Sequence, residues 1–155
     1  MNTEQRASGA QRAAVSVPAT SANLGPGYDC LGAALDLRDY YRVELTTAPG
    51  VRVHVTGAGA DTVPRDHSNL VASSFLRCFE HRGDTPPVGV DIYCTNAIPH
   101  GRGLGSSSAA TVGGLALGRA MSVRGDGLPN YALLEFATEL EGHPANVAPA
   151  LFGGF

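Results

Sequence analysis

A glycine-rich segment at residues 99–110 constrains the fold of this chain more than any other feature. After Pro99, three glycines alternate with other residues, and three serines then open a run of small residues with helical spacing: Gly101, Gly103, Gly105, Ser106, Ser107 and Ser108. Glycine lacks a Cβ atom, so nearby backbone N–H groups can turn toward an anion, and the start of a helix adds free N–H groups and the positive end of its dipole. The segment therefore predicts a phosphate-binding loop that leads into a helix.

This loop differs from the two best-known phosphate-binding motifs. It lacks the lysine that follows the glycines of a P-loop, and alanine or serine stands where the dinucleotide-binding fingerprint has its third glycine. An ordinary glycine turn capped by serine is the alternative that a short motif would favour. The residues 101–105 alone leave both interpretations open.

Hydropathy patterns along the rest of the chain predict an α+β fold. Alternation predicts strands at residues 13–17 and 88–94, and a hairpin of residues 41–45 and 51–55 around Pro49 and Gly50. We expect Pro18 to stop the first strand and residues 18–32 to form a loop. Spacing of three and four residues predicts helices at 69–82, 106–121 and 131–140, the first capped by Ser68 or Asn69 and ended by Gly83. Strands followed by interspersed helices are typical of the α+β class.

Composition excludes several classes of partner. A chain of 155 residues with 43% hydrophobic residues is long enough for one domain with a core. The net charge of −3 and the scattered basic residues argue against a nucleic-acid partner. Three cysteines without a CxxC pair argue against a disulfide framework and a zinc site. We therefore expect a cytoplasmic protein without nucleic-acid or membrane partners.

The N-terminal segment has a different character from the rest. Residues 1–12 are polar and lack the apolar run of a signal peptide, so we expect a flexible tail there. Residues 13–155 then form a single domain.

Three segments together resemble the GHMP kinases. The segment from Pro99 to Ala110 resembles the nucleotide-binding motif of that family over its whole length. Residues 18–29, PATSANLGPGYD, resemble its first motif in the homoserine kinase form, and residues 139–151 resemble the EGHPDNVAPAL segment of homoserine kinases. The resemblance implies the N-terminal, ATP-binding domain of a GHMP kinase, a ribosomal protein S5 domain 2-like fold with a mixed or antiparallel sheet and helices packed on one side. It also implies ATP-dependent phosphorylation of L-homoserine to O-phospho-L-homoserine, a step of threonine biosynthesis.

The resemblance assigns roles to residues of all three segments. It implies that ATP is bound by Pro99, Gly101, Arg102, Gly103, Leu104, Gly105, Ser106, Ser107 and Ser108. For Mg²⁺, which prefers one or two carboxylates beside phosphate oxygens, it favours Ser107 with Glu141, and Glu139 is the runner-up. The expected substrate-binding residues are Asn23, Asp29, His143 and Asn146, and Asn23 and Asn146 are the expected catalytic ones.

Plainer interpretations of the same residues also exist. Asn23 and Asp29 lie in a segment where such side chains often bond only to the backbone of a turn. Glu139 and Glu141 can lie on a solvated helix end, with His143 and Asn146 merely capping the turn that follows. The residue types alone do not decide between these interpretations and the functional ones.

Two departures from the family pattern bear on activity. Ala145 stands where homoserine kinases have an aspartate near the substrate hydroxyl, and family members are roughly twice as long as this chain. We therefore expect weak or absent turnover, and an exposed apolar face that leads to aggregation or a homodimer. The alternatives are a GHMP kinase for another small alcohol, such as mevalonate or a sugar, and a non-catalytic domain that binds a nucleotide or an amino acid.

Overall fold

The structure, a computed structural model, describes residues 11–155. Its elements in chain order are β1 (Arg12–Ala22), β2 (Gly32–Leu45), β3 (Gly50–Gly57), α1 (Leu70–Arg82), β4 (Gly89–Asn96), α2 (Ser106–Met121), the short 3-10 helix η2 (Gly125–Gly127), α3 (Asn130–Glu141) and α4 (Val147–Phe152). Residues 1–10, most of the segment interpreted as a flexible tail, lie outside the described residues. β1 begins one residue before the strand predicted from residue 13, because Arg12 already pairs with Glu44 of β2.

The four strands form one mixed sheet in the order β1-β2-β4-β3. β2 is antiparallel to both β1 and β4, whereas β3 is parallel to β4. The α+β class and the mixed sheet are thus confirmed, but the predicted hairpin is wrong, since β4 lies between its two strands. Alternating hydropathy identifies a strand without identifying its neighbour. The pairing partner of β2 and β3 comes from residues 89–96, beyond helix α1, and no local turn pattern signals it.

Pro18 does not end the first strand. β1 continues to Ala22, and the register with β2 shifts between Pro18, which pairs with Arg38, and Ala19, which pairs with Leu35. Proline has no N–H to donate, but it is tolerated on an edge strand or at a bulge, and β1 offers both. The expected loop at residues 18–32 is accordingly shorter, and it spans residues 23–31.

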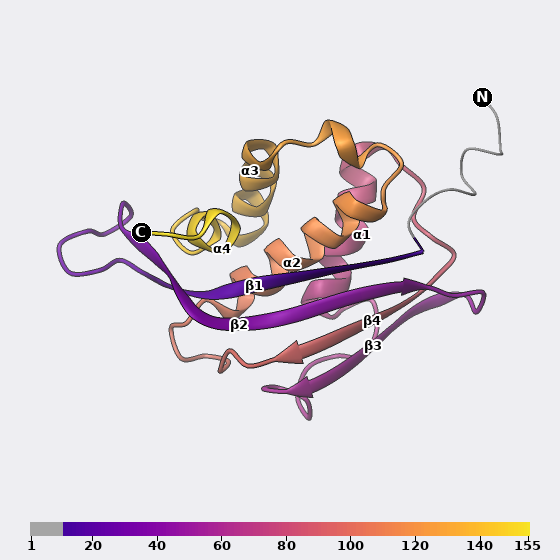
Figure 1. Ribbon diagram of the computed structural model, residues 1–155, viewed down its shortest axis with the longest axis horizontal. Coiled ribbons are helices and arrows are strands. Elements are labelled where there is room, and N and C mark those ends of the chain that lie inside the picture. The colour runs from indigo at the N-terminus through magenta and orange to yellow at the C-terminus, as the bar shows by residue number, and fades with distance from the viewer. Residues whose placement is uncertain (1–10) are drawn as a thin grey trace.

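The helices cover one face of the sheet (Figure 1). The predicted helices α1, α2 and α3 are confirmed, and α1 has Asn69 as its N-cap and Gly83 in the left-handed conformation at its end. α1 and α2 approach each other closely because α2 carries glycine at the contact. A Cβ atom on Gly114 would lie 2.3 Å from the carbonyl oxygen of Val71, and one on Gly118 would lie 2.5 Å from Cβ of Cys78.

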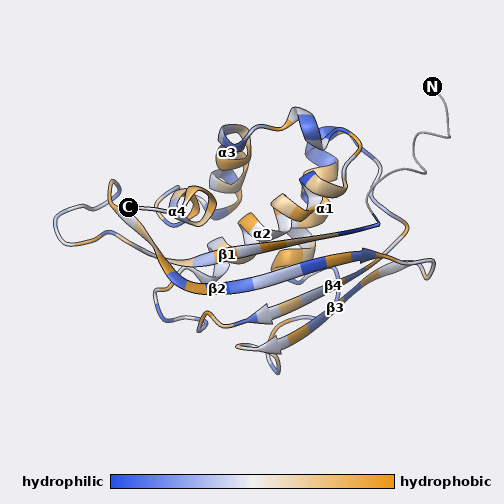
Figure 2. Ribbon diagram, viewed as in Figure 1, coloured by the Kyte–Doolittle hydropathy of each residue, from blue (hydrophilic) through white to orange (hydrophobic). Residues whose placement is uncertain are grey.

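The core lies between the helix layer and the sheet. Phe75 of α1, Leu115 of α2 and Ile92 of β4 are fully buried there. Burying a side chain of this size contributes about 1.5–3 kcal/mol relative to leaving it exposed. Figure 2 shows hydrophobic and hydrophilic residues alternating along β2, the pattern of a strand with one face against the core.

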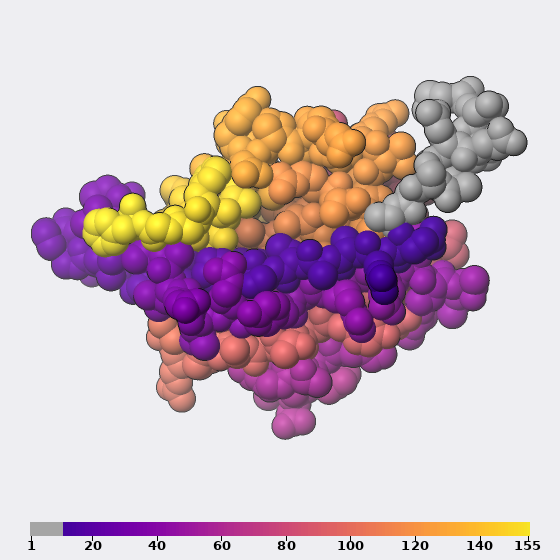
Figure 3. All heavy atoms as spheres, in the orientation of Figure 1, coloured from indigo at the N-terminus to yellow at the C-terminus, as the bar shows by residue number. Residues whose placement is uncertain are grey.

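The C-terminal residues lie against the loop that follows β1 (Figure 3). The sequence did not predict α4, a six-residue helix with Pro149 in its first turn, and Gly154 beyond it accepts a hydrogen bond of 2.8 Å from the backbone N–H of Ala34. Large exposed apolar side chains line two hollows beside α4: Leu31, Leu35, Phe152 and Phe155. Self-association through them stays a prediction that light scattering can test.

Among residues 11–155, no helix combines the length and the apolar character that crossing a bilayer demands.

Candidate active site

The glycine loop adopts backbone angles that favour glycine. Gly101, Gly103 and Gly105 have φ values of +64°, +70° and +67°, in the left-handed region that other residues rarely adopt. Gly105 is also the N-cap of α2, and a Cβ atom there would lie 2.0 Å from Oγ1 of Thr20. The same position therefore demands glycine for its conformation and for the close approach of β1.

Backbone N–H groups at the end of this loop are free to bind a ligand. Within residues 11–155, the amides of residues 103–108 donate no hydrogen bond to other backbone groups, and no side chain caps α2. The first N–H groups of a helix have no partner inside the helix, and they carry its positive dipole end. The structure thus places the loop at the mouth of a helix with its amides unpaired, which is the arrangement that an anion requires.

The carboxylate of Glu141 lies across the first turn of α2. Its Oε2 accepts hydrogen bonds from the hydroxyls of Ser107 (3.0 Å) and Ser108 (2.9 Å), and its Oε1 accepts one from Thr111 (2.8 Å). The sequence predicted that Ser107 and Glu141 lie together, and it missed Ser108 and Thr111 as partners of Glu141. A Thr three residues after Ser108 lies on the same helix face, so the spacing of the hydroxyls was the available signal.

Glu139 lies apart from this cluster. It is exposed on α3, and within the described residues it makes no hydrogen bond. Glu141, by contrast, is the last residue of α3, where Gly142 ends the helix in the left-handed conformation. The last residue of α3 therefore faces the glycine loop, whereas Glu139, two residues earlier on the same helix, faces solvent.

The cluster supplies oxygen donors of the kind that suit Mg²⁺. One carboxylate and three hydroxyls meet at the helix start, and Mg²⁺ bound with a nucleotide takes one or two carboxylates and keeps phosphate and water oxygens for its other positions. Among residues 11–155 no group of three or more His, Cys, Asp or Glu side chains could hold a metal ion. The oxygen donors at the start of α2 are of the types that Mg²⁺ takes beside phosphate oxygens.

Thr20 joins the glycine loop to the turn after α3. Its hydroxyl donates a hydrogen bond of 2.9 Å to Oδ1 of Asn146, and its backbone N–H donates one of 3.0 Å to the carbonyl of Leu104. Thr20 is fully buried at the end of β1. The sequence did not single out Thr20, because the interpretation of Pro18 as a strand end placed this residue in a loop.

The loop after β1 is shaped by Asn23 and Asp29. Both have positive φ, +57° and +61°, and Oδ1 of Asn23 accepts a hydrogen bond of 2.9 Å from the backbone N–H of Asp29. This contact matches the plainer interpretation of Asn23, as a residue that bonds to the backbone of its own turn, and it leaves the Asn23 amide group as a donor. Asp29 is exposed, and only its backbone N–H takes part in that contact.

Asp29 and Ala145 line the same hollow. Its volume is about 350 Å³, and Leu31, Pro149 and Phe152 are among its other lining residues. His143 is exposed on the turn between α3 and α4 and does not line it. The structure therefore brings the first loop and the turn after α3 together, as the sequence predicted, but it leaves His143 outside.

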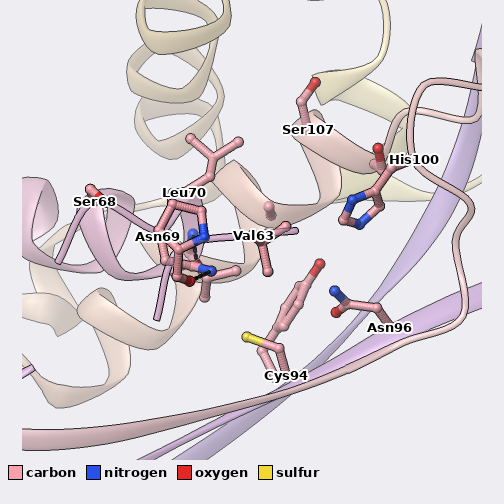
Figure 4. Close-up of a pocket in the computed structure, with 13 residues that line it drawn as sticks. Val63, Ser68, Asn69, Leu70, Cys94, Asn96, His100 and Ser107 are labelled. Carbon is pink, nitrogen blue, oxygen red and sulfur yellow. Dashed lines mark hydrogen bonds between the residues drawn. The ribbon is translucent and has the colours of Figure 1, made fainter. Parts of the chain in front are cut away.

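A second cavity of about 300 Å³ opens beside the helix start (Figure 4). Ser107 lies at its mouth, Asn96 and His100 lie on one side, and Ser68, Asn69 and Leu70 lie on the other. No sequence pattern assigned a role to His100 or predicted the cavity, since its walls come from segments that are far apart in the chain. Burial, followed by the charge of Asp39, raises the pKa of Cys94 at its floor to about 12, so this thiol stays protonated.

Comparison with known proteins agrees with this architecture. Residues 69–154 match the family described as "GHMP kinases N terminal domain". The homoserine kinase of Streptomyces avermitilis is 52% identical over 142 residues, which are 91% of this chain and 46% of that protein. The homoserine kinase of Cutibacterium acnes is 52% identical over 141 residues, 90% of this chain and 48% of that protein. The chain thus spans about half the length of the curated relatives it matches.

Solved structures share the fold. The crystal structure of homoserine kinase from Cytophaga hutchinsonii superposes with a TM-score of 0.79 at 36% identity, over 94% of this chain and 47% of that one. The mevalonate kinase of Methanococcus jannaschii superposes with a TM-score of 0.70 at 15% identity, which shows the fold alone. With the glycine loop at the mouth of α2 and a family match over more than half of its residues, this chain belongs to the GHMP kinases and carries their N-terminal domain.

Proposed function

We propose that this chain forms the ATP-binding half of an enzyme that transfers the γ-phosphoryl group of ATP to the hydroxyl of L-homoserine, giving O-phospho-L-homoserine. The observation that carries the proposal is the carboxylate of Glu141 across the first turn of α2, beside unpaired amides of the glycine loop. Homoserine kinases of about 50% identity support the choice of acceptor. A cytoplasmic location belongs to the same proposal, because both substrates are metabolites of that compartment.

The nucleotide is proposed to lie along the start of α2. The amides of residues 103–108 would receive its phosphates, with Pro99, Gly101 and Arg102 forming the outer wall of the loop. The neighbouring cavity of about 300 Å³, largely apolar and reaching Ser107, is large enough for the flat base of a nucleotide. Phosphates at the helix start and a base in this cavity are compatible, since Ser106 and Ser107 belong to both.

Mg²⁺ is proposed to be held by Glu141 and Ser107, where it would screen the charge that develops on the transferred group. Glu141 already accepts the Ser107 hydroxyl at 3.0 Å, so the two ligands are in place before the nucleotide arrives. Glu139 is a poor second candidate, because it is exposed on α3 and makes no hydrogen bond with the start of α2.

The acceptor is proposed to lie between the first loop and the turn after α3. Asp29 lines the hollow there and supplies a carboxylate for an ammonium group, and the free amide of Asn23 can donate to a hydroxyl. Asn146 would orient the reacting hydroxyl, since Thr20 fixes its Oδ1 and leaves its amide N–H groups as donors. His143 would act only at the rim of the site.

These residues accelerate the transfer by alignment. The transition state of phosphoryl transfer is loose, so positioning and charge stabilisation can carry most of the catalysis without a strong base. Asn23 and Asn146 are therefore proposed as the catalytic residues in the sense that they contact and orient the acceptor.

Ala145 favours a second candidate, a GHMP kinase for a less polar alcohol. The hollow that contains Asp29 is lined mostly by apolar groups, including Leu31, Ala145 and Phe152. An acceptor without an ammonium group, such as mevalonate, would leave Asp29 unpaired but would fill the rest of the hollow. A non-catalytic domain that only binds a nucleotide is the third candidate.

Calorimetry and turnover assays separate these candidates. We expect MgATP to bind the folded chain, Glu141→Gln to weaken the binding by about tenfold or more, and the matched variant Glu139→Gln to leave it unchanged. Release of ADP is then measured with L-homoserine, mevalonate and a hexose in turn. A folded chain that takes up no MgATP would overturn the proposal, and turnover with mevalonate but not homoserine would replace the acceptor.

A further inference from the structure

Asp39 is a buried carboxylate that contacts the start of the glycine loop. It lies on the core-facing side of β2 and is 1% exposed. Its Oδ1 accepts hydrogen bonds from the backbone N–H groups of Ala97 (2.7 Å) and Ile98 (2.8 Å). Its Oδ2 accepts a hydrogen bond of 2.9 Å from the hydroxyl of Tyr41.

A carboxylate in this place needs all three partners. An ionised group away from water is costly unless hydrogen bonds replace its hydration. Hydrogen bonds to a charged acceptor are about twice as strong as neutral ones, and the distances of 2.7 and 2.8 Å agree with that class. Two consecutive amides on one oxygen also fix the direction in which the chain leaves β4.

The two amides are the last fixed point before the glycines. β4 ends at Asn96, and Ala97 and Ile98 lead directly into Pro99. At the other end of the loop, the N–H of Thr20 holds the carbonyl of Leu104 at 3.0 Å. The glycines at 101 and 103 lie between these points with no atoms near their Cβ positions, so the anchors at the two ends determine where the loop amides lie.

Tyr41 extends the same contact to α2 and to the cavity beside it. A Cβ atom on Gly113 would lie 2.3 Å from the ring of Tyr41, so helix and ring are in close contact. Tyr41 also lines the cavity of about 300 Å³. Burial, with Asp39 next, raises the pKa of the Tyr41 hydroxyl well above its usual value, so the hydroxyl remains a donor at any physiological pH.

We infer that Asp39 is a positioning residue for the glycine loop: by holding Ala97, Ile98 and Tyr41 together, it sets the place of the loop amides relative to the helix start and the cavity. The inference rests on the proposed function for its ligand, a nucleoside triphosphate. Asp39 touches neither the loop glycines nor the cavity itself, so it acts through the backbone that it holds.

Three variants of the 155-residue chain test this role. Asp39→Ala removes all three contacts. Asp39→Asn keeps one oxygen that can accept from Ala97 and Ile98, and its amide group can donate to Tyr41. Asp36→Ala is the matched control, because Asp36 is exposed on the same strand. The readouts are amide hydrogen exchange without ligand and calorimetry with MgATP and with inorganic tripolyphosphate.

We expect the loss to be local and to be rescued by asparagine. In Asp39→Ala, exchange at residues 97–98 should rise about tenfold or more and affinity for both phosphate ligands should fall about tenfold or more. Exchange in the middle of β4 should stay within about twofold of the unchanged chain. Asp39→Asn should retain affinity within about threefold, and Asp36→Ala should match the unchanged chain.

Two results would overturn the inference. One is Asp39→Ala with unchanged exchange at residues 97–98 or unchanged affinity. The other is a loss of affinity of about tenfold or more in Asp39→Asn relative to the unchanged chain, which would mean that the charge and not the positioning matters. This second result is measured against the unchanged chain, so it decides even if the alanine variant fails to fold. If the unchanged chain binds no phosphate ligand, the proposed function fails, and the exchange rates at residues 97–98 still decide whether Asp39 fixes the loop.

Discussion

Replacing Glu141 by alanine removes the acceptor of three hydroxyls at once. Ser108 and Thr111 are 1% and 0% exposed, so neither hydroxyl can turn to water, whereas Ser107 is exposed and can. A buried hydroxyl left without its partner costs about 1–3 kcal/mol. Thr111 can recover part of this by bonding to a helix carbonyl. We therefore expect the free energy of unfolding to fall by about 3 kcal/mol, which lowers the melting midpoint of a domain of this size by about 6–12 °C.

Urea unfolding followed by circular dichroism measures this difference. Glu139→Ala is the control, since this side chain is exposed on the same helix and its loss should change the free energy of unfolding by less than about 0.5 kcal/mol. Glu141→Gln should lie between the two, because its amide oxygen accepts from one side only. If Glu141→Ala is as stable as Glu139→Ala, the hydroxyls do not depend on this carboxylate, and the description of a preformed cluster at the start of α2 is wrong.

Three further predictions follow from single contacts. Gly105→Ala should lower the free energy of unfolding by more than about 2 kcal/mol, because the new side chain adds left-handed backbone strain and collides with Thr20. Gly101 faces open space, so Gly101→Ala should cost only the backbone strain of about 1–2 kcal/mol, and thermal melts compare the two variants. The pKa of Asp91 is lowered by Arg52 and then His54, so its contribution to stability is present above about pH 4 and is lost as the pH falls through the lowered value. Asp91→Asn should therefore be less stable than the unchanged chain at pH 7, and urea unfolding should show the difference shrinking as the pH falls below about 4. Iodoacetamide at pH 8 should label only Cys30 in the native chain, since burial raises the pKa of Cys78 to about 11 and that of Cys94 to about 12. Mass spectrometry that finds either buried thiol labelled in the native chain would contradict this.

Local sequence patterns predicted the helices well and the sheet order badly. α1 and α2 have apolar residues at helical spacing and clear end signals, such as Asn69 and Gly83, so a window of neighbouring residues contains what decides them. The partner of a strand is decided by residues far away. β3 pairs with β4 across the whole of α1, and no property of residues 50–57 distinguishes this from a hairpin with β2.

The residues of the candidate site also fall into two groups, those that a local sequence motif predicts and those that only the fold brings together. The glycine loop and the pairing of Ser107 with Glu141 could be predicted because each motif carries its own residue pattern. Thr111, Asn96 and the cavity wall at Asn69 could not, because their importance comes from what the fold places beside them. Ala145 was visible as a departure from a pattern, but only the structure shows that it shares a hollow with Asp29.

The register shift in β1 explains why the loop has two anchors. Because Pro18 pairs with Arg38 and Ala19 with Leu35, two residues of β2 have no partner in β1. A bulge of this kind bends a strand and redirects its side chains, and such bulges are common beside active sites. Here Thr20, just after the shift in β1, reaches the end of the glycine loop, and Asp39, just after the bulge in β2, reaches its start. The proline that suggested a strand end therefore marks the irregularity beside which two neighbouring strands hold one loop at both ends, Thr20 through its backbone N–H and Asp39 through its carboxylate.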